Sequence, residues 1–255
     1  MWFQLKSYFK FLWSSSNQHG VHSPFVYNLV TKCFYDTKNK AAYEKIADYR
    51  KKIFQNQELI EVTDFGAGSR VFKSNKRKVS AIAKNAGISW KRSKLLFRIA
   101  NYLNFKNALE LGTSVGLATS SLATNKDLEV LTIEGCPETA RIAEEAFNNF
   151  NLTNIELKTG KFEEVLKNYH QKIDLAYIDG NHSKEATLEN FELLLKLKHN
   201  ESLFIFDDIY WSKEMQEAWQ QIKNHPEVTV TIDTFHWGLV FFRKEQEKEH
   251  FKIRV

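Results

Sequence analysis

The sequence predicts an α/β fold in which a doubly wound, mostly parallel, seven-stranded sheet carries an antiparallel C-terminal hairpin and an N-terminal helical extension. Short apolar runs alternate with segments of helical periodicity from Ser89 onward, and strands that alternate with helices form a parallel sheet covered on both faces. The last two runs have no helix between them, so one strand must run antiparallel to the rest. The apolar runs span residues 107–111, 128–133, 155–157, 173–178, 203–206, 228–232 and 239–242.

The N-terminal third has a different pattern, and we expect it to form an extension over residues 1–88, ahead of a main domain over residues 89–255. Residues 1–13 combine eight aromatic or aliphatic side chains with two lysines, which predicts a short amphipathic helix. Its apolar face is expected to pack on the rest of the protein or on a second subunit rather than on a membrane surface. A Ser-Pro pair starts the next helix, which runs to residue 34. Further helices are expected at residues 41–54, 89–103, 137–150 and 184–197.

Composition excludes several classes of protein. The 255 residues include 36 basic and 31 acidic side chains, a net charge of +5, and the two signs are interleaved, which argues against a nucleic-acid partner. Cys33 and Cys136 lie far apart and outside any C-x-x-C motif, so neither a disulfide framework nor a zinc site is expected. These cysteines suit a reducing cytoplasm. No apolar run approaches the ~20 residues of a membrane-spanning helix, so no transmembrane segment is expected.

A glycine turn follows the first of the seven runs. The strand at residues 107–111 breaks at Gly112, and the chain enters a helix after Gly116. Gly112 allows a sharp turn and a close approach of the backbone to a ligand, and Gly116 allows the helix to pack closely. The next strand ends in Glu134, 22 residues after Gly112, the separation at which an acid reaches ribose hydroxyls in such folds. Together these features predict a nucleoside cofactor.

The order Glu110-x-Gly112-x-x-x-Gly116 resembles the first motif of class I S-adenosylmethionine-dependent methyltransferases and lacks the third glycine of a dinucleotide fingerprint. The resemblance covers residues 89–242 and implies a Rossmann-like methyltransferase fold that binds S-adenosyl-L-methionine. It implies that residues around Glu110 to Gly116 line the methionine portion, that Glu134 holds the ribose, and that residues 160–162 border the adenine. The implied cofactor-binding residues are Glu110, Gly112, Thr113, Ser114, Gly116, Glu134, Gly135, Gly160, Lys161, Phe162 and Asp179.

Two details of this region carry further expectations. Ala118 stands where close relatives often have serine, and Thr119 is the candidate source of the missing hydroxyl. Residues 62–69 also look like a strand that ends in a glycine turn. Residues 73–78 are expected to form a basic loop, so no apolar strand ending in an acid follows the glycine turn. We therefore interpret residues 64–69 as a structured loop.

Acidic residues follow two later strands. Asp179 ends one apolar run, and Asp207 and Asp208 end the next. The carboxyl ends of parallel strands meet at one edge of a sheet, so these three carboxylates are expected to converge near the cofactor. A set of oxygen ligands without sulfur selects Mg²⁺, Ca²⁺ or Mn²⁺. For each acid alone, capping of the next helix is an equally good explanation.

This acid pattern narrows the resemblance to the metal-dependent O-methyltransferases, which include catechol, caffeoyl-coenzyme A and macrolide-sugar enzymes. The resemblance implies that Asp179, Asp207 and Asp208 bind a divalent cation, for which Mg²⁺ is the first candidate. Asp208 and His182 stand where the sugar-type enzymes have aspartate and histidine. His182 would then take the proton of the acceptor hydroxyl, unless it is only a helix-entry residue.

Tyr210 and Trp211 follow the acid pair directly and are candidates to wall the substrate pocket, or else to pack under the following helix. Related enzymes use their N-terminal segments to cover substrate, which is the role expected of residues 1–88. The aromatic first helix is also compatible with a homodimer.

The function that we expect is that of a cytoplasmic, metal-assisted, S-adenosylmethionine-dependent O-methyltransferase acting on a small hydroxylated molecule. One alternative is a metal-independent N- or RNA methyltransferase that uses the basic residues of 73–78 as a phosphate contact. Another is an S-adenosylmethionine-binding protein without catalytic activity. A nicotinamide-dependent oxidoreductase is disfavoured because the dinucleotide glycine is missing.

Overall fold

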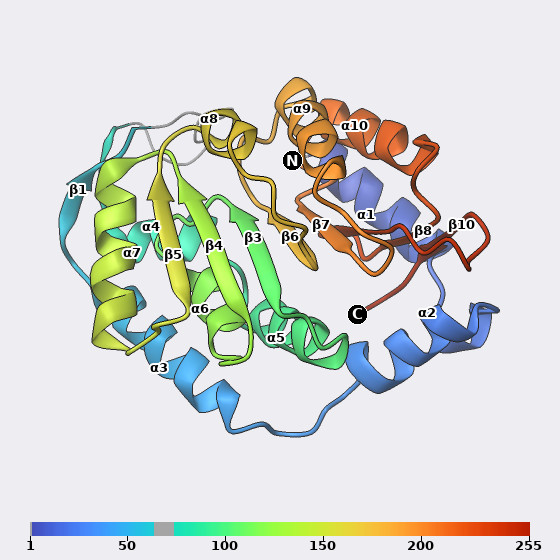
Figure 1. Cartoon of the computed structure of the whole chain (residues 1–255), viewed down its shortest axis with the longest axis horizontal. Coiled ribbons are helices and arrows are strands. Elements are labelled where there is room, and N and C mark those ends of the chain that lie inside the picture. The colour runs from blue at the N-terminus through green and yellow to red at the C-terminus, as the bar shows by residue number, and fades with distance from the viewer. Residues whose placement is uncertain (1, 64–73) are drawn as a thin grey trace. The chain divides into compact units, whose positions relative to one another are not determined.

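The fold is that of a computed structural model, which describes residues 2–63 and 74–255 (Figure 1). The chain forms two compact units. The first, here called the terminal unit, combines Met1–Asp36 with His170–Val255, and the second, the central unit, is Thr37–Tyr169. Residues 1–88, the expected N-terminal extension, are therefore divided between the two units after Asp36.

The central unit contains three parallel strands in the order β3-β4-β5. Asn107 pairs with Glu129 across the first two strands, and Val130 pairs with Ile155 across the last two. All three strands were predicted from their apolar runs. A small antiparallel pair, β1 and β2, was not. The elements are α3 (Ala42–Gln55), β1 (Leu59–Glu61), β2 (Lys76–Lys78), α4 (Val79–Ala86), α5 (Trp90–Tyr102), β3 (Asn107–Leu111), α6 (Leu117–Ala123), β4 (Glu129–Glu134), α7 (Pro137–Asn149), β5 (Ile155–Thr159) and α8 (Phe162–Lys167).

The terminal unit contains strands in the order β6-β7-β9-β8-β10. Strand β9 runs antiparallel to β7 and β8, while β6 is parallel to β7 and β10 is parallel to β8. The predicted closing hairpin, β8 and β9, is therefore confirmed. The elements are α1 (Trp2–Ser14), η1 (Gln18–Gly20), α2 (Pro24–Leu29), η2 (Val30–Phe34), β6 (Leu175–Ile178), α9 (Lys184–Leu195), β7 (Leu203–Asp207), α10 (Lys213–Asn224), β8 (Val230–Asp233), β9 (Trp237–Phe241) and β10 (Glu249–Lys252).

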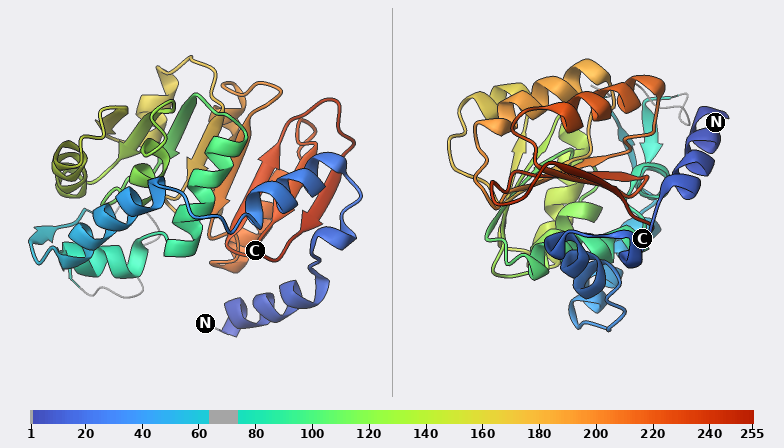
Figure 2. Two further views of the ribbon diagram at one scale, coloured as in Figure 1. Left: turned by 90° about the horizontal axis from the view of Figure 1, so that it is seen from below. Right: turned by 90° about the vertical axis from the view of Figure 1, so that its right-hand side faces the viewer.

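Helices cover both faces of the terminal unit's sheet. Helices α9 and α10 lie on one face and α2 on the other (Figure 2). Phe191 of α9 packs on Phe204 and Phe206 of β7, with ring centroids 6.5 and 6.0 Å apart. On the opposite face Phe25, next to the start of α2, packs edge-on against Phe241 at 5.1 Å. All residues of β6, β7 and β9 are buried, as expected for apolar strands covered on two sides.

The number of strands differs from the prediction. Among residues 2–63 and 74–255, the central unit has three strands in the order β3-β4-β5, and the terminal unit has five in the order β6-β7-β9-β8-β10. These are eight strands, whereas seven were predicted. The additional strand is β10, whose sequence Glu-His-Phe-Lys has no apolar run. Main-chain hydrogen bonds hold it instead, because Glu249 N donates to Thr229 O and Ser16 N donates to Lys252 O, both at 2.9 Å.

The N-terminal helices largely follow their sequence signals. The Ser23 hydroxyl accepts a hydrogen bond from Val26 N at 3.4 Å, which confirms the predicted start of α2. Lys76–Lys78 forms strand β2, so the predicted basic loop at 73–78 is wrong for these three residues; paired with Leu59–Glu61, they have backbone partners that a loop would lack. Lys73 and the glycine-containing segment 64–69 lie outside the described residues. Across the described chain, no helix has both the length and the apolar character needed to cross a membrane.

Candidate cofactor and acceptor sites

The turn after β3 has an unusual backbone. Gly112, Ser114 and Gly116 have positive φ angles of 103°, 50° and 76°. A Cβ atom on Gly116 would lie 2.4 Å from Tyr49 Oη and 2.5 Å from the ring of Phe147. The two glycines therefore do what the sequence predicted: Gly112 permits the sharp turn and Gly116 permits close packing at the start of α6.

Glu134 links the turns that follow β3 and β4. Its Oε2 accepts a hydrogen bond from Ser114 N at 2.7 Å, and its Oε1 accepts one from Cys136 N at 2.9 Å. Burial raises the pKa of the Glu134 carboxyl, although the backbone amides oppose the shift. Gly160 N, after β5, donates to Glu134 O at 2.9 Å. The structure thus brings together three predicted cofactor residues from three strand ends: Ser114, Glu134 and Gly160.

Gly135 lies within the turn between Glu134 and Cys136. After β5, Gly160 has a positive φ of 156°, and Lys161 is the N-cap residue of α8, which begins at Phe162. These residues therefore lie on the segments that Glu134 joins.

Glu110 is a fully buried carboxyl group in β3. Its Oε2 accepts hydrogen bonds from the hydroxyls of Thr119 and Thr132 at 2.5 and 2.6 Å. Among the described residues its Oε1 has no hydrogen-bond partner. Burial raises the pKa of this carboxyl to about 7, although the two hydroxyls oppose the shift. Thr119 was the expected source of a hydroxyl beside Ala118, and in the structure this hydroxyl donates its hydrogen bond to Glu110.

Two residues around this site, Tyr49 and Thr132, were not anticipated. The hydroxyl of Tyr49, on α3, donates to Val115 O at 3.0 Å, so a helix of the supposed extension supports the glycine turn. Thr132 interrupts the apolar run of β4, and this interruption is the signal that could have identified it. The Thr113 hydroxyl lies 2.6 Å from that of Thr132 and extends the chain of polar groups that leads to Glu110.

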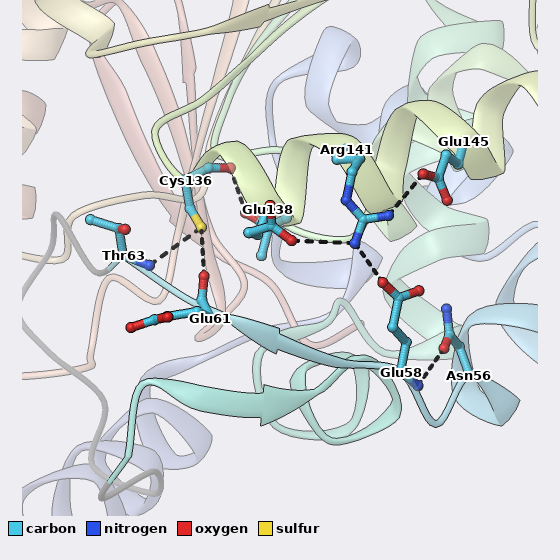
Figure 3. Close-up of polar contacts among 9 residues, drawn as sticks. Asn56, Glu58, Glu61, Thr63, Cys136, Glu138, Arg141 and Glu145 are labelled. Atoms are coloured by element: carbon cyan, nitrogen blue, oxygen red, sulfur yellow. Dashed lines mark hydrogen bonds and ion pairs between the residues drawn. The ribbon is translucent and has the colours of Figure 1, made fainter.

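Cys136 also connects the site to strand β1 (Figure 3). Its sulfur accepts a hydrogen bond from Thr63 N at 3.3 Å and donates to Glu61 O at 3.9 Å.

Further along α7, the Arg141 guanidinium binds Glu58 at 2.5 Å, at the other end of β1, as well as Glu138 and Glu145 at 3.3 and 2.8 Å (Figure 3). Strand β1 is therefore fixed along α7, next to the turn that holds Glu134.

In the terminal unit, a tyrosine hydroxyl joins the ends of β6 and β7. Tyr177 Oη donates to Asp207 Oδ2 at 2.7 Å and lies 3.5 Å from Asp179 Oδ2. His182 Nε2 lies 3.7 Å from Asp179 Oδ1, and its ring centroid is 5.9 Å from that of Trp211. The structure therefore brings Asp179, Asp207, His182 and Trp211 into one neighbourhood.

The predicted metal ligands do not form a common site in this conformation. Asp208 has a positive φ of 53°, and its N–H donates to Asp207 Oδ1 at 2.8 Å. Asp207 thus accepts hydrogen bonds at both carboxylate oxygens. Within residues 2–63 and 74–255, no three His, Cys, Asp or Glu side chains form a group that could hold a metal ion. The metal role of Asp179, Asp207 and Asp208 stays a prediction.

Tyr210, the other candidate substrate residue, is buried. Its hydroxyl donates to Asp233 Oδ2 at 2.6 Å, and its ring stacks on Phe235 with centroids 5.1 Å apart. Burial and the neighbouring Asp233 carboxylate raise the pKa of Tyr210. This residue therefore lies between the β7 end and the turn that joins β8 to β9.

Comparisons with known proteins agree with the resemblance inferred from the motifs. Residues 109–209 match a family described as a methyltransferase domain. A catechol O-methyltransferase of Niastella koreensis is 28% identical over 129 residues, which cover 48% of this chain and 58% of that protein. The chain thus spans little more than half the length of this relative.

Two solved structures share the fold. An O-methyltransferase from Bacillus cereus in complex with SAH has a TM-score of 0.54 at 18% identity, over 81% of this chain and 93% of that one. A SAH-bound methyltransferase of Podospora anserina has a TM-score of 0.61 at 12% identity, over 88% and 97%. The resemblance to class I S-adenosylmethionine-dependent methyltransferases is confirmed.

Proposed function

We propose that the chain is an S-adenosylmethionine-dependent O-methyltransferase that acts on a small hydroxylated molecule. The observation that supports this most strongly is the arrangement around Glu134. Its two carboxylate oxygens are fixed by the amides of Ser114 and Cys136, beside a turn with positive φ angles at Gly112 and Gly116. An oriented carboxylate at the end of the second strand is the group that recognises ribose hydroxyls in such folds.

The residues of the central unit fit this cofactor. The buried Glu110 Oε1, without a partner among the described residues, could accept a hydrogen bond from a cationic group of the ligand. Gly112, Thr113, Ser114 and Gly116 would bind the methionine portion with Glu110. Glu134 and Gly135 would bind the ribose, and Gly160, Lys161 and Phe162 would border the adenine. The proposed set also includes Asp179, which belongs to the terminal unit.

The cofactor, when bound, supplies a methyl group on a positively charged sulfur that an oxygen nucleophile can attack directly. The acceptor must then lose its hydroxyl proton. We assign this proton to His182 Nε2, because imidazole is well suited to accept a proton near neutral pH. Asp179 and Trp211 lie next to this ring: Asp179 Oδ1 is 3.7 Å from His182 Nε2, and the Trp211 and His182 ring centroids are 5.9 Å apart. Trp211 and Tyr210 are the proposed contacts of the acceptor.

A divalent cation is a further part of the proposal. Asp179, Asp207 and Asp208 are an oxygen-only donor set of the kind that Mg²⁺ prefers, and a bound cation would favour the ionised acceptor hydroxyl. The three carboxylates do not form a group that could hold a metal ion in the described part of the chain. The role assigned to His182 does not depend on the cation.

The test is methyl transfer from S-adenosylmethionine carrying a tritiated methyl group to a panel of phenols and sugars, with Mg²⁺ or with a chelator. We expect His182→Ala to lower kcat by about 10²-fold or more while cofactor affinity stays unchanged. His170→Ala, an exposed histidine outside the site, serves as the matched control. Equal rates for His182→Ala and the wild type would contradict the base assignment. An unchanged rate of methyl transfer in the presence of the chelator would contradict the proposed role of the cation. Cofactor binding without product from any acceptor would favour the non-catalytic alternative.

A further inference from the structure

The terminal unit contains a cavity that none of the assigned site residues except Tyr210 lines. Its volume is about 180 Å³, which is about the space of six water molecules. Side chains of α1, α10, β10 and the segment after β7 surround it, and the polar ones that matter here are Lys10, Tyr210, Gln216, Gln220, Lys223 and Lys252.

Three positive charges face this cavity, and each comes from a different element. Within residues 2–63 and 74–255, no ion pair with a carboxylate within 4.0 Å involves Lys10, Lys223 or Lys252. Lys252 Nζ instead donates to the Ser14 hydroxyl at 3.0 Å. Burial lowers the pKa of Lys223, the Asp233 carboxylate opposes this shift, and the positive charge of Lys252 adds to it. The cavity therefore concentrates like charges that an anion would compensate.

The carboxylate of Asp233 is the acidic group that interacts with these lysines, and it is already engaged. Its Oδ2 accepts from Tyr210 and its Oδ1 accepts from Phe235 N at 2.8 Å. Lys252 and Lys223 act to lower the pKa of Asp233, but burial outweighs them and the pKa is raised. One partly compensated carboxyl group against three ammonium groups leaves an excess of positive charge.

Helix α1 is held in place over the cavity. The rings of Tyr8 and Phe11 pack on Phe235, with centroids 4.9 and 5.7 Å apart, and Phe235 in turn stacks on Tyr210. Behind the helix, Ser16 forms a β-bridge with Ile253 beside β10. These contacts hold α1 at the cavity, which Lys10 lines together with Lys223 and Lys252.

The cavity lies at the sheet edge that also carries the proposed acceptor residues of this unit. Strands β7, β8 and β10 are parallel to one another and end at Asp207, Asp233 and Lys252, so these ends share one edge. Adjacent strands are about 4.8 Å apart, so with β9 between them the ends of β7 and β8 are separated by about 10 Å, and β10 is about 5 Å further. A molecule of ordinary metabolite size can span this distance.

We propose that the cavity binds a phosphate group carried by the methyl acceptor. The inference rests on the proposed function, which it extends from hydroxylated molecules to hydroxylated molecules that are phosphorylated. A phosphate brings up to two negative charges and several acceptor oxygens, which matches three ammonium groups better than a carboxylate does. The side-chain amides of Gln216 and Gln220 add neutral donors. The phosphate could belong to a soluble metabolite or to a lipid headgroup.

The first experiment measures binding of inorganic phosphate to the full chain by calorimetry at constant ionic strength. We expect saturable binding to the wild type and at least a tenfold loss of affinity in Lys223→Gln. Lys213→Gln is the matched control, because it removes the same charge from an exposed site of the same helix. SAH affinity, measured in parallel, should not change in either variant and reports that both are folded. Absence of saturable phosphate binding, or equal losses in both variants, would overturn the proposal.

A second experiment distinguishes the two sources of phosphate. The outer surface of α1 exposes Trp2 and Trp13, at 86% and 95%. Sedimentation with phosphatidylglycerol vesicles, with phosphatidylcholine vesicles as reference, tests a lipid source, and a Trp2→Ser, Trp13→Ser double variant controls for insertion of α1. Binding to anionic vesicles that is lost in Lys223→Gln assigns the phosphate to a headgroup. Phosphate binding without vesicle binding assigns it to a soluble molecule. Vesicle binding that does not need Lys223, together with no phosphate binding, contradicts the proposal.

Kinetics then separate this inference from the proposed function. For a phosphorylated acceptor and its dephosphorylated counterpart, we expect Lys223→Gln to raise KM tenfold or more for the first only, with kcat unchanged. Methyl transfer to neutral acceptors alone, with the same KM in both proteins, would leave the methyltransferase assignment standing and refute the phosphate site.

Discussion

Replacing Glu110 by Gln changes the pH dependence of stability in a way that the structure specifies. The carboxyl group is buried, and its pKa is raised from 4.5 to about 7. Since the protonated form is favoured in the folded state, its contribution to stability is fully present below pH 4.5 and is lost as the pH rises to 7. Between pH 5 and pH 8 the wild type should lose about 2–3 kcal/mol through this group.

Glu110→Gln has no such titration. Its side-chain oxygen can still accept hydrogen bonds from Thr119 and Thr132, but its NH₂ group would replace Oε1, which has no partner among the described residues. At pH 5 the protonated carboxyl group of the wild type likewise has an O–H donor in this position, so the amide adds little cost relative to it. The variant should therefore be about as stable as the wild type at pH 5 and about 2–3 kcal/mol more stable at pH 8. Urea unfolding followed by tryptophan fluorescence at both pH values measures the difference, and two parallel stability curves would refute the reasoning.

Three further substitutions test other parts of the structure. Gly116→Ala should lower the free energy of unfolding by about 2–4 kcal/mol, because of the positive φ and the contact with Tyr49, and should weaken SAH binding; a neutral effect on thermal melting would show that the turn adapts. Tyr210→Phe should cost about 1–3 kcal/mol in urea unfolding, because Asp233 Oδ2 loses its donor. Arg141→Ala should cost no more than about 1 kcal/mol, since its ion pairs are exposed; a loss twice as large would mean that β1 depends on them.

Much of the parallel framework could be predicted because its strands, of four to six residues, contain apolar runs. The structure finds all seven, and β3 has the predicted bounds, Asn107–Leu111. Strands β1, β2 and β10 could not be predicted in this way. They have three or four residues, are rich in charged side chains, and depend on hydrogen bonds to a neighbouring strand. Such bonds leave no periodic signal in the sequence.

The candidate site divides along similar lines. The spacing from Gly112 to Glu134 could be recognised in the sequence because Gly112 follows one apolar strand and Glu134 ends the next. The roles of Tyr49 and Cys136 could not, because they arise from contacts between segments distant in sequence. Tyr49 Oη reaches Val115 O, 66 residues away, and Cys136 contacts the chain at Glu61 and Thr63. The division of residues 1–88 after Asp36 likewise follows from packing rather than from any break in composition.

Calorimetric titration of the full chain with SAH tests the central claim most directly, with Glu134→Gln as the comparison. The account predicts one saturable site in the wild type and a loss of affinity of tenfold or more in the variant, because one carboxylate oxygen that would receive ribose hydroxyls becomes an amide nitrogen. Absence of binding to the wild type, or equal affinity in both proteins, would contradict the assignment of the glycine turn and Glu134 as a cofactor site.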